Sequence, residues 1–545
     1  MIGVSEHATI ALNNHRALPI RHLRNYVNTN TDVLTYAGVE NDKKEIETGI
    51  TNTPFESISA PKLAECVELT LADGRTLICS YDQEIMLTTG EWKRADDFIV
   101  DVDEVFVGPQ LPTFIGDEDD RMEEKDWSFT VDDFTFRTDT IVNLEKTLAF
   151  VRVLGYFLAD GNLFQDKRCD SIAASVAMGC VIDAWSMIDD VKKAFGFLLH
   201  LPNRINGMYA VNLSPKIGKI FSHIDGVSVG PRMDQDSNVP PFIMTAPRIV
   251  IAQFLNGLLG GDGLTVSSLH SKTNKFHLTY WIGFCFSKSN KQHENALVYR
   301  QELVSLLSKF DMKIIKRKPN VYSTLNNTDN RSYLIKIPTE SFLQFVKNIG
   351  FAHCVSKSIR LTAASALYHY NEMVKVQDYQ LTKLFDKYCE YSRVIQEADD
   401  LGYEDHVKGH YVQTNLKMSG TQARLNAIET YKKKNPLFGK IISKNSIVLS
   451  IRYGKIPVTN IDGKNILKSW GSYYWFRTEN TEVKKGPAGK KITKITYANP
   501  QDKLTTPCMT MKVVYKRYVG LKLIYTLTVP ITESYLANGI VVRSL

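Results

Sequence analysis

Two aspartates, Asp160 and Asp262, end two similar nine-residue segments and are the side chains best placed to carry chemistry. The segments, Val153–Gly161 and Leu255–Gly263, align without a gap, and each is typical of a short apolar helix that ends in Asp-Gly. The C-terminus of a helix carries about half a negative charge, so a carboxylate there is unfavourable. A divalent cation would reverse this penalty, which makes both positions candidate metal sites.

Small residues indicate how the two helices are arranged. Gly155 and Ala159 are four residues apart and share a helix face, and Gly257 and Gly261 do the same. Because glycine inside a helix costs about 0.5–1 kcal/mol, its repeated use favours close contact between the two helix backbones. Such packing would bring the two carboxylates together, where like charges repel unless metal is bound. A simple C-cap turn is the alternative for either copy alone.

The segments belong to an internal duplication of about 102 residues. After Asp160 the pattern predicts a strand, a helix and a strand at 171–178, 183–197 and 208–213. After Asp262 it predicts strands at 276–286, 312–316 and 333–337 and helices at 292–310 and 339–349. We therefore expect an α-β-β-α-β-β-α unit used twice, with pseudo-two-fold symmetry.

The flanks of the duplication have different patterns. Residues 1–110 indicate short strands, among them an alternating run at 65–71, a turn at 72–75 and a return at 76–79. An acidic segment at 113–127 is typical of a solvated linker. Residues 365–475 are more helical and polar. Strands return after residue 495 and include 521–529 and 540–542, with an Asn-Gly turn at 538–539.

Composition gives broader limits. The 545 residues have a formal net charge of +7 and a pI near 8.7, which only hints at an anionic partner. The eight cysteines are scattered without zinc-site spacing, so no zinc is expected. Neither a secretory signal nor an apolar run of about 18 residues is present, so we expect a soluble intracellular protein without a membrane partner, nuclear in a eukaryotic host.

Both nine-residue segments resemble the LAGLIDADG motif of homing endonucleases, and the resemblance covers about residues 140–370. It implies that the motif helices pack at the centre of a saddle whose sheets lie along double-stranded DNA. It also implies a long pseudo-palindromic target and a monomer with internal pseudo-two-fold symmetry. By the same resemblance, Asp160 and Asp262, with Gly161 and Gly263 beside them, bind Mg²⁺, or Mn²⁺ in its place, for two-metal phosphodiester hydrolysis.

Basic residues complete this expectation. The segment 350–361 resembles one that carries a catalytic lysine in the family, which points to Lys357. The first repeat should carry its equivalent just before Val239, where residues 236–238 contain no lysine and Arg232 is the nearest substitute. Strand residues expected to neutralise DNA phosphates, rather than merely to be solvated, are Lys288, Lys291, Lys313, Lys316, Arg317 and Lys318.

The flanking β segments resemble the two halves of an intein splicing domain, the Hint domain. Residues 90–98 resemble the segment after the second splicing block, residues 521–529 and 535–542 resemble the final blocks, and residues 460–545 resemble inteins of RNA polymerase subunit genes. The catalytic positions depart from this pattern at Ser5, Gln83, Arg543 and Ser544. Glutamine cannot exchange protons as histidine does, and serine cannot form the succinimide that releases an intein. We expect no self-splicing.

The predicted fold is therefore α+β: an all-β Hint-like domain split by a LAGLIDADG domain, (αββαββα) twice, plus a mostly helical insert. The parts are the N-terminal β half (1–112), the acidic linker (113–139), the endonuclease domain (140–370, repeats 140–240 and 241–370), the insert (371–475) and the C-terminal β half (476–545). The insert contacts DNA or is a spacer. Alternatives to a DNA endonuclease are a DNA-binding protein that has lost cleavage, an RNA maturase, and a splicing-competent intein with non-standard residues.

Overall fold

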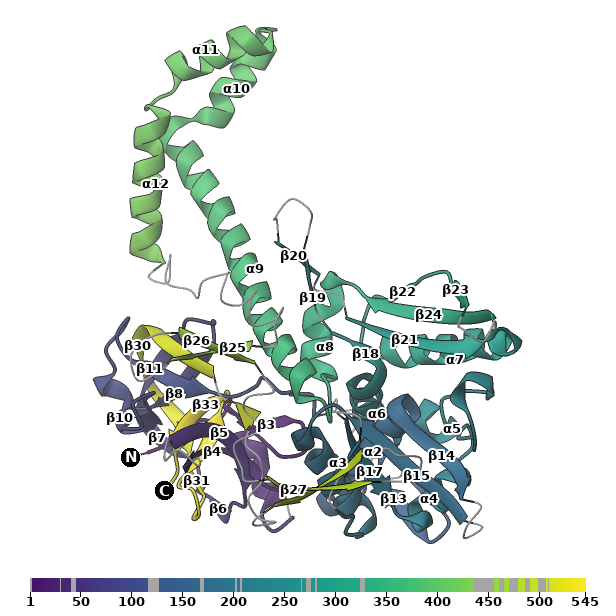
Figure 1. The fold of residues 1–545 in the computed structure, drawn as a ribbon. Helices are drawn as coiled ribbons and strands as arrows, with labels where there is room; N and C mark the ends of the chain where they lie inside the picture. The colour runs from purple at the N-terminus through teal and green to yellow at the C-terminus, as the bar shows by residue number, and fades with distance from the viewer. Residues whose placement is uncertain are drawn as a thin grey trace.

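The structure, a computed structural model, is of mixed α and β type (Figure 1). It describes residues 2–29, 31–40, 46–115, 127–166, 171–200, 203–205, 208–265, 267–270, 276–279, 282–323, 329–435, 455–459, 465–469, 479–485, 491–497, 506–507 and 509–545. In Figure 1, a β domain lies beside a mixed α and β region, and a long helical arm rises from between them. Within these ranges, no helix is both long and apolar enough to cross a membrane.

The β domain is built from both ends of the chain. Its eleven-stranded sheet has the order β1-β8-β7-β30-β11-β33-β32-β2-β3, with β9 beside β33 and β10 beside β9. The strands are β1 (Val4–Ser5), β2 (Thr9–Ala11), β3 (Ala17–Pro19), β7 (Lys62–Leu71), β8 (Thr76–Ser80), β9 (Glu84–Met86), β10 (Trp92–Arg94), β11 (Glu104–Val107), β30 (Met509–Tyr525), β32 (Ser534–Ala537) and β33 (Ile540–Arg543). Because β30 lies between β7 and β11, the two ends form one folding unit.

Smaller elements complete this domain. Two further sheets have the orders β29-β5-β4 and β31-β6. Their strands are β4 (Val33–Glu40), β5 (Ile46–Thr53), β6 (Ser57–Ile58), β29 (Thr506–Pro507) and β31 (Leu527–Thr528), and two 3-10 helices are η1 (Ile20–Tyr26) and η2 (Ala95–Asp97). Both expected turns are present. Gly74, with φ of 87°, links β7 to β8, and Asn538 and Gly539 have the positive φ values, 49° and 74°, of a tight hairpin.

The first half of the mixed region follows the β domain. Its elements are α2 (Ile141–Asp160), β14 (Gly161–Asp166), β15 (Ser171–Met178), α3 (Val181–Phe195), β16 (Asn203–Ile205), β17 (Met208–Leu213) and α4 (Pro215–Ser222). The strands pair in the order β14-β15-β17-β16. The strands predicted at 171–178 and 208–213 match β15 and β17, because alternation with one buried face is a strong pattern.

The second half repeats this arrangement. Its elements are α6 (Arg248–Asp262), β18 (Gly263–Leu264), β19 (Ser267–His270), β20 (Phe276–Thr279), β21 (Ile282–Ser289), η4 (Asn290–Gln292), α7 (His293–Ser308), β22 (Ile315–Lys316), β23 (Asn320–Ser323), β24 (Asp329–Ile337), η5 (Thr339–Ser341) and α8 (Phe342–Asn348). The strand order β18-β21-β24-β22 corresponds to that of the first half. Between the halves lie η3 (Arg232–Asp234) and α5 (Pro241–Met244).

Two strand predictions in this half need correction. The segment 276–286 is not one strand, because β20 pairs with β19 in a separate hairpin while β21 belongs to the main sheet. The strand predicted at 312–316 is reduced to Ile315 and Lys316. Lys313 instead donates its backbone N–H to Ser341 Oγ at 2.7 Å, outside the ladder.

The predicted linker at 113–139 is partly a packed element. Residues 116–126, which carry its acidic run, lie outside the described residues. After them, β12 (Ser128–Val131) and β13 (Phe134–Arg137) form a hairpin against α2. The ring of Phe136 stacks on that of Phe150 at 3.8 Å between centroids. The aromatic side chains of this hairpin therefore pack the second half of the predicted linker against α2.

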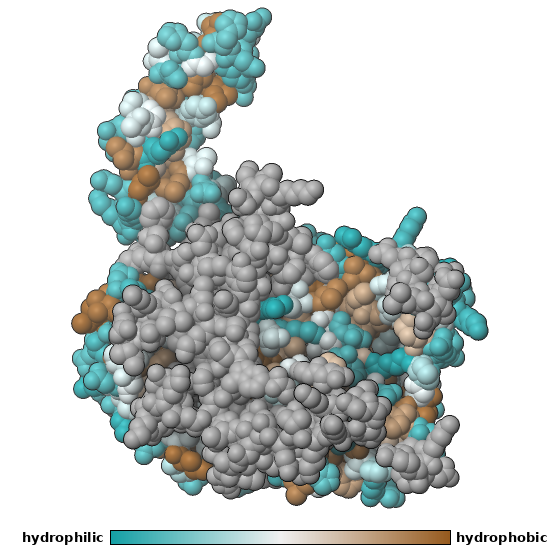
Figure 2. Space-filling view, viewed as in Figure 1, coloured by the Kyte–Doolittle hydropathy of each residue, from teal (hydrophilic) through white to brown (hydrophobic). Residues whose placement is uncertain are grey.

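The helical arm consists of α9 (Val355–Cys389), α10 (Tyr391–Asp400), α11 (Asp405–Asn415) and α12 (Gly420–Lys434). Residues 371–434 carry ten basic and ten acidic side chains, so net charge does not favour DNA contact by the helices. Figure 2 shows apolar patches between polar ones on the arm, and Leu401 and Leu425 are more than half exposed.

The rest of the predicted insert and the start of the C-terminal half contain strands. In the insert, β25 (Lys455–Thr459) and β26 (Asn465–Ser469) form a hairpin rather than a helix. Next come β27 (Glu479–Lys485) and β28 (Lys491–Tyr497), and β28 pairs with β16. This second hairpin extends the sheet of the first repeat, although it falls within the range predicted for the β domain.

Helices α2 and α6 form the centre of the mixed region, and their backbones touch at glycine. A Cβ atom added at Gly155 would lie 2.2 Å from the carbonyl oxygen of Phe254. One added at Gly257 would lie 2.1 Å from the carbonyl oxygen of Arg152, and one at Gly261 2.4 Å from Cβ of Ala159. These positions tolerate no side chain without a shift of backbone, as the two small-residue faces predicted.

We expect the Gly257→Ala substitution to lower the free energy of unfolding by roughly 1–3 kcal/mol, because the added methyl group forces the helices apart. Gly409→Ala is the matched control. Gly409 lies inside α11 with open space around it, and alanine there should stabilise the helix by about 0.5–1 kcal/mol. Thermal unfolding of both variants measures the difference. Equal stability of Gly257→Ala and the natural chain would contradict the packing.

Candidate active site

The two motif helices end at one cleft. Asp160 and Asp262 both line this cleft of about 390 Å³, whose walls come from both repeats. Asp160 Oδ2 lies 3.3 Å from the position that a Cβ at Gly261 would take, so the carboxylate of one helix reaches the end of the other. Within the described part of the chain, neither carboxylate accepts a hydrogen bond from a side chain or backbone N–H.

Both carboxylates are electrostatically unfavourable here. Burial, and then the charge of Asp160, raises the pKa of Asp262 to about 7. Partial desolvation also raises the pKa of Asp160, whose side chain is exposed at the cleft, while Lys357 and Arg232 act in the opposite direction. Hard divalent cations prefer such oxygen ligands, and they would neutralise the two carboxylates directly. The two side chains therefore fit a divalent metal site.

Lys357, predicted from the sequence to be catalytic, lies at the end of α6 beside this cleft. It comes from the first turn of α9, and its Nζ donates hydrogen bonds to the carbonyl oxygens of Leu259 (3.2 Å), Gly260 (2.7 Å) and Gly261. These carbonyls are the last ones of α6 and carry the negative end of its dipole. Lys357 thus places a cation beside Asp262 and stabilises the helix end that holds it.

Arg232 takes the corresponding place in the first repeat. Its guanidinium donates to the carbonyl oxygen of Phe157 in α2. Phe157 and Leu259 each precede their aspartate by three residues, so Arg232 and Lys357 bind equivalent carbonyls. The expected position, 236–238, was therefore too late in the chain, and the cation is an arginine. An isolated basic residue in the segment between the repeats was the only signal.

Gly161 and Gly263 permit the tight passage from helix to strand. Each donates its backbone N–H to the same carbonyl, Phe157 or Leu259, that the nearby cation binds. A Cβ at Gly263 would lie 2.1 Å from the carbonyl oxygen of Leu259. Their conformational role is thus evident, and their contribution to metal binding stays a prediction.

Lys288 requires a correction, because it does not face outward to DNA. It is 4% exposed, and its Nζ donates to the carbonyl oxygens of Arg232 and, at 2.7 Å, Gln235. Burial lowers its pKa to about 8. The register of β21 turns this side chain toward the segment between the repeats, which the sequence alone did not reveal.

The other predicted phosphate-binding residues are exposed. They are Lys291 in η4, Lys313 before β22, Lys316 within β22, and Arg317 and Lys318 after it. Lys316 also donates from Nζ to Oε1 of Gln301 at 2.9 Å. These five cations remain available for an anionic partner.

The predicted splicing positions lie in the β domain. Gln83 is fully buried and donates from Nε2 to the carbonyl oxygen of Arg543 at 2.9 Å. Arg543 in turn donates to Glu84 Oε2 at 2.7 Å, and Ser544 Oγ accepts the N–H of Val529 at 3.2 Å. Ser5 is buried in β1. The structure brings Gln83 to the end of β33, where its Nε2 is hydrogen-bonded while its buried Oε1 has no partner among the described residues.

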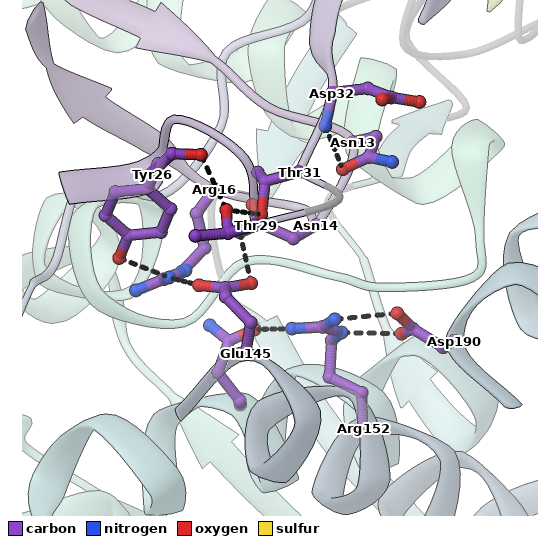
Figure 3. Close-up of polar contacts among 11 residues, drawn as sticks. Asn13, Asn14, Arg16, Tyr26, Thr29, Thr31, Asp32, Glu145, Arg152 and Asp190 are labelled. Carbon is purple, nitrogen blue, oxygen red and sulfur yellow. Dashed lines mark hydrogen bonds and ion pairs between the residues drawn. The ribbon is translucent and has the colours of Figure 1, made fainter. Parts of the chain in front are cut away.

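A second polar cluster joins the β domain to α2 and α3. His15, Asp190 and His353 place potential ligand atoms within 4.8 Å of one another. However, Arg152 donates to both oxygens of Asp190 at 2.7 Å, and Ser186 Oγ lies within hydrogen-bond distance of both histidines, at 2.8 and 2.9 Å (Figure 3 shows the Arg152 contact). Burial lowers the pKa of both histidines. The adjacent guanidinium disfavours a cation, so this cluster fits a structural role.

A further buried ion pair strengthens this junction. Arg16, in the loop between β2 and β3, contacts Glu145 of α2, and both side chains are almost fully buried. Asn14 donates to the other oxygen of Glu145 at 2.7 Å (Figure 3). The β domain is therefore attached directly to the helix that carries Asp160.

Comparison with known proteins gives weak similarities. No protein-family model matches the chain. A replication factor C small subunit of Methanocaldococcus jannaschii is 19% identical over 323 residues. The match covers 56% of this chain and only 16% of the length of that relative.

Similar solved structures include inteins and LAGLIDADG proteins. A DnaB intein of Synechocystis sp. is 15% identical, with a TM-score of 0.16, and the match covers 20% of this chain and 69% of the intein. The homing endonuclease I-WcaI bound to its DNA recognition sequence is 11% identical, with a TM-score of 0.24 and coverage of 43% and 89%. Full-length DUF199/WhiA of Thermatoga maritima is 11% identical, with a TM-score of 0.22 and coverage of 58% and 96%.

The raised pKa of Asp262 predicts that the stability of the folded chain depends on pH. The folded chain retains this proton up to about pH 7, whereas an unfolded aspartate loses it near pH 4, so stability falls as pH rises between these values. Without metal, Asp262→Asn should therefore unfold at a higher temperature than the natural chain at pH 8, by roughly 2–4 °C, and at the same temperature at pH 4.

Differential scanning calorimetry in chelator checks this expectation. Asp378→Asn is the control, because Asp378 is exposed on α9 and does not line the cleft. An Asp262→Asn variant that is less stable than the natural chain at pH 8 would contradict the electrostatic account.

Proposed function

We propose that this chain is a site-specific DNA endonuclease of the LAGLIDADG type, which hydrolyses both strands of double-stranded DNA. The observation that carries the proposal is the pair of carboxylates at the ends of two closely packed, duplicated helices, which accept no hydrogen bond from the residues that the structure describes. Equivalent carbonyls behind these carboxylates each bind a cation, Arg232 or Lys357. A symmetric site of this kind suits two similar reactions on two antiparallel strands.

Asp160 and Asp262 would hold Mg²⁺, or Mn²⁺ in its place. When bound, the metal lowers the pKa of water and stabilises the charge that develops on the phosphate. Lys357 and Arg232 place positive charge beside the carboxylates, where they would stabilise the same charge. Lys357, which can lose a proton, could also transfer one to or from water, whereas a guanidinium remains protonated.

Double-stranded DNA is the partner we propose for the sheets of the two repeats. The exposed cations around β22 and in η4 would neutralise phosphates, and two repeats with the same strand order suit a long pseudo-palindromic site read by one chain. Binding should weaken as salt is added, because counterions are released from DNA.

A second candidate is a DNA-binding protein that has lost cleavage. The specific observation in its favour is that the first repeat carries Arg232 where the second carries Lys357. An arginine cannot serve as a general base, so one strand could be cut slowly or not at all.

We expect Asp160→Asn and Asp262→Asn each to reduce cleavage by at least about 100-fold, because a divalent cation contributes several kcal/mol to catalysis. The assay incubates the full chain with a plasmid library of genomic inserts, with Mg²⁺ and with chelator. Asp378→Asn should cut as the natural chain does. Specific cuts that persist in both motif variants would contradict the proposed site, and binding without cuts by the natural chain would favour the second candidate.

For the β domain we propose an intein-type scaffold that no longer splices. Gln83 occupies the position where splicing needs a proton-exchanging histidine, and its amide is hydrogen-bonded to Arg543. The chain, placed between foreign flanking sequences, should therefore remain joined to them during prolonged incubation. Mass spectrometry would reveal an excised 61.7 kDa product, and its appearance would support the alternative of splicing by non-standard residues.

A further inference from the structure

The segment 230–239, which links the two repeats, is held mainly by side chains of the second repeat. Its only helical turn is η3. Gln292 donates to the carbonyl oxygen of Asp234 at 3.1 Å. Asn295 accepts the N–H of Ser237 at 2.7 Å, and Glu302 accepts that of Val239 at 2.8 Å. The backbone of this segment is therefore fixed from β21, η4 and α7.

Lys288 is the cation among these contacts. Its ammonium group binds the carbonyl oxygens of Arg232 and Gln235 from within the protein. A buried ammonium is costly unless it is well hydrogen-bonded, and hydrogen bonds from a charged donor are the strong ones. Lys288 lies in the wall of the same cleft as Asp160 and Asp262. The hydrogen bonds that offset the cost of burying this ammonium group also fix the backbone of Arg232.

Arg232 is consequently held at both ends. Lys288 binds its main-chain carbonyl, and its guanidinium binds the carbonyl oxygen of Phe157. The charges of Asp262 and Asp160 both act on this guanidinium. A shift of the backbone at residue 232 would therefore move the only cation that caps α2 beside Asp160 among the described residues.

We infer that Lys288 is a positioning residue: from the second repeat, it sets Arg232 at the cleavage site of the first repeat. This inference rests on the proposed endonuclease function and deepens it, because it makes one half of the site dependent on the other. Lys288 acts through Arg232 and contacts neither DNA nor metal.

The test compares four single variants of the full chain and one double variant, Lys288→Met/Arg232→Gln. Lys288→Met removes the donors and keeps an apolar stem, and Lys288→Arg restores a charged donor. Arg232→Gln removes the cation that Lys288 positions. Lys219→Met is the matched control, because Lys219 is an exposed lysine on α4 outside the cleft. End-labelled DNA carrying a cleaved site reports the cutting rate of each strand separately.

We expect Lys288→Met to slow the same strand as Arg232→Gln, by about tenfold or more, as expected for the loss of charged hydrogen bonds. The double variant should cut that strand no more slowly than Arg232→Gln alone, since both changes act through one group. Lys288→Arg should recover most of the rate, and Lys219→Met should not change it. Equal slowing of both strands by Lys288→Met, or additive losses in the double variant, would overturn the inference.

Amide hydrogen exchange separates this inference from the proposed function. In Lys288→Met, the amides of Ser237 and Val239 should exchange about tenfold faster than in the natural chain, as expected when strong hydrogen bonds are lost. Lys288→Arg should restore the slow exchange. Unchanged exchange in Lys288→Met overturns the positioning role, whether or not the chain cuts DNA. Absence of cleavage by the natural chain overturns the endonuclease proposal alone.

Discussion

Backbone contact between α2 and α6 is the constraint on which the rest of the structure depends. The crossing requires glycine at 155, 257 and 261, because a single methyl group at any of them would overlap the partner helix. The same contact sets the separation of the two C-termini and therefore of Asp160 and Asp262. Each sheet begins at Gly161 or Gly263, directly after its aspartate, so the helix pair also places the two sheets relative to each other.

The electrostatics of the site follow from this geometry. Two negative helix ends and two carboxylates meet at one cleft. The nearby cations, Arg232 and Lys357, bind main-chain carbonyls at the helix ends and not the carboxylates. The carboxylate oxygens remain open toward the cleft. The pKa of Asp262 is about 7, so ionisation of this carboxylate lowers the stability of the folded chain. A bound cation can offset this loss. Junction contacts such as Arg16 with Glu145 attach this centre to the β domain.

The sequence predicted the parts of the fold that have strong local patterns. Asp-Gly endings and small-residue faces located both motif helices, and alternation located β15 and β17. It could not predict the direction of Lys288, because a lysine in a strand is usually exposed and only the register of β21 turns it inward. The position of Arg232 beside α2 could not be predicted for a related reason. Its contact with Phe157 depends on a segment that residues of the second repeat hold in place. Contacts between distant segments leave no periodic signal.

The central claim is that Asp160 and Asp262 together form a divalent metal site. Electron paramagnetic resonance of Mn²⁺, titrated into the natural chain at pH 8, measures this directly when compared with the Asp160→Asn/Asp262→Asn double variant. The account predicts that the natural chain binds Mn²⁺ and quenches its free signal, and that the double variant does not. Equal Mn²⁺ binding by the two proteins would contradict it.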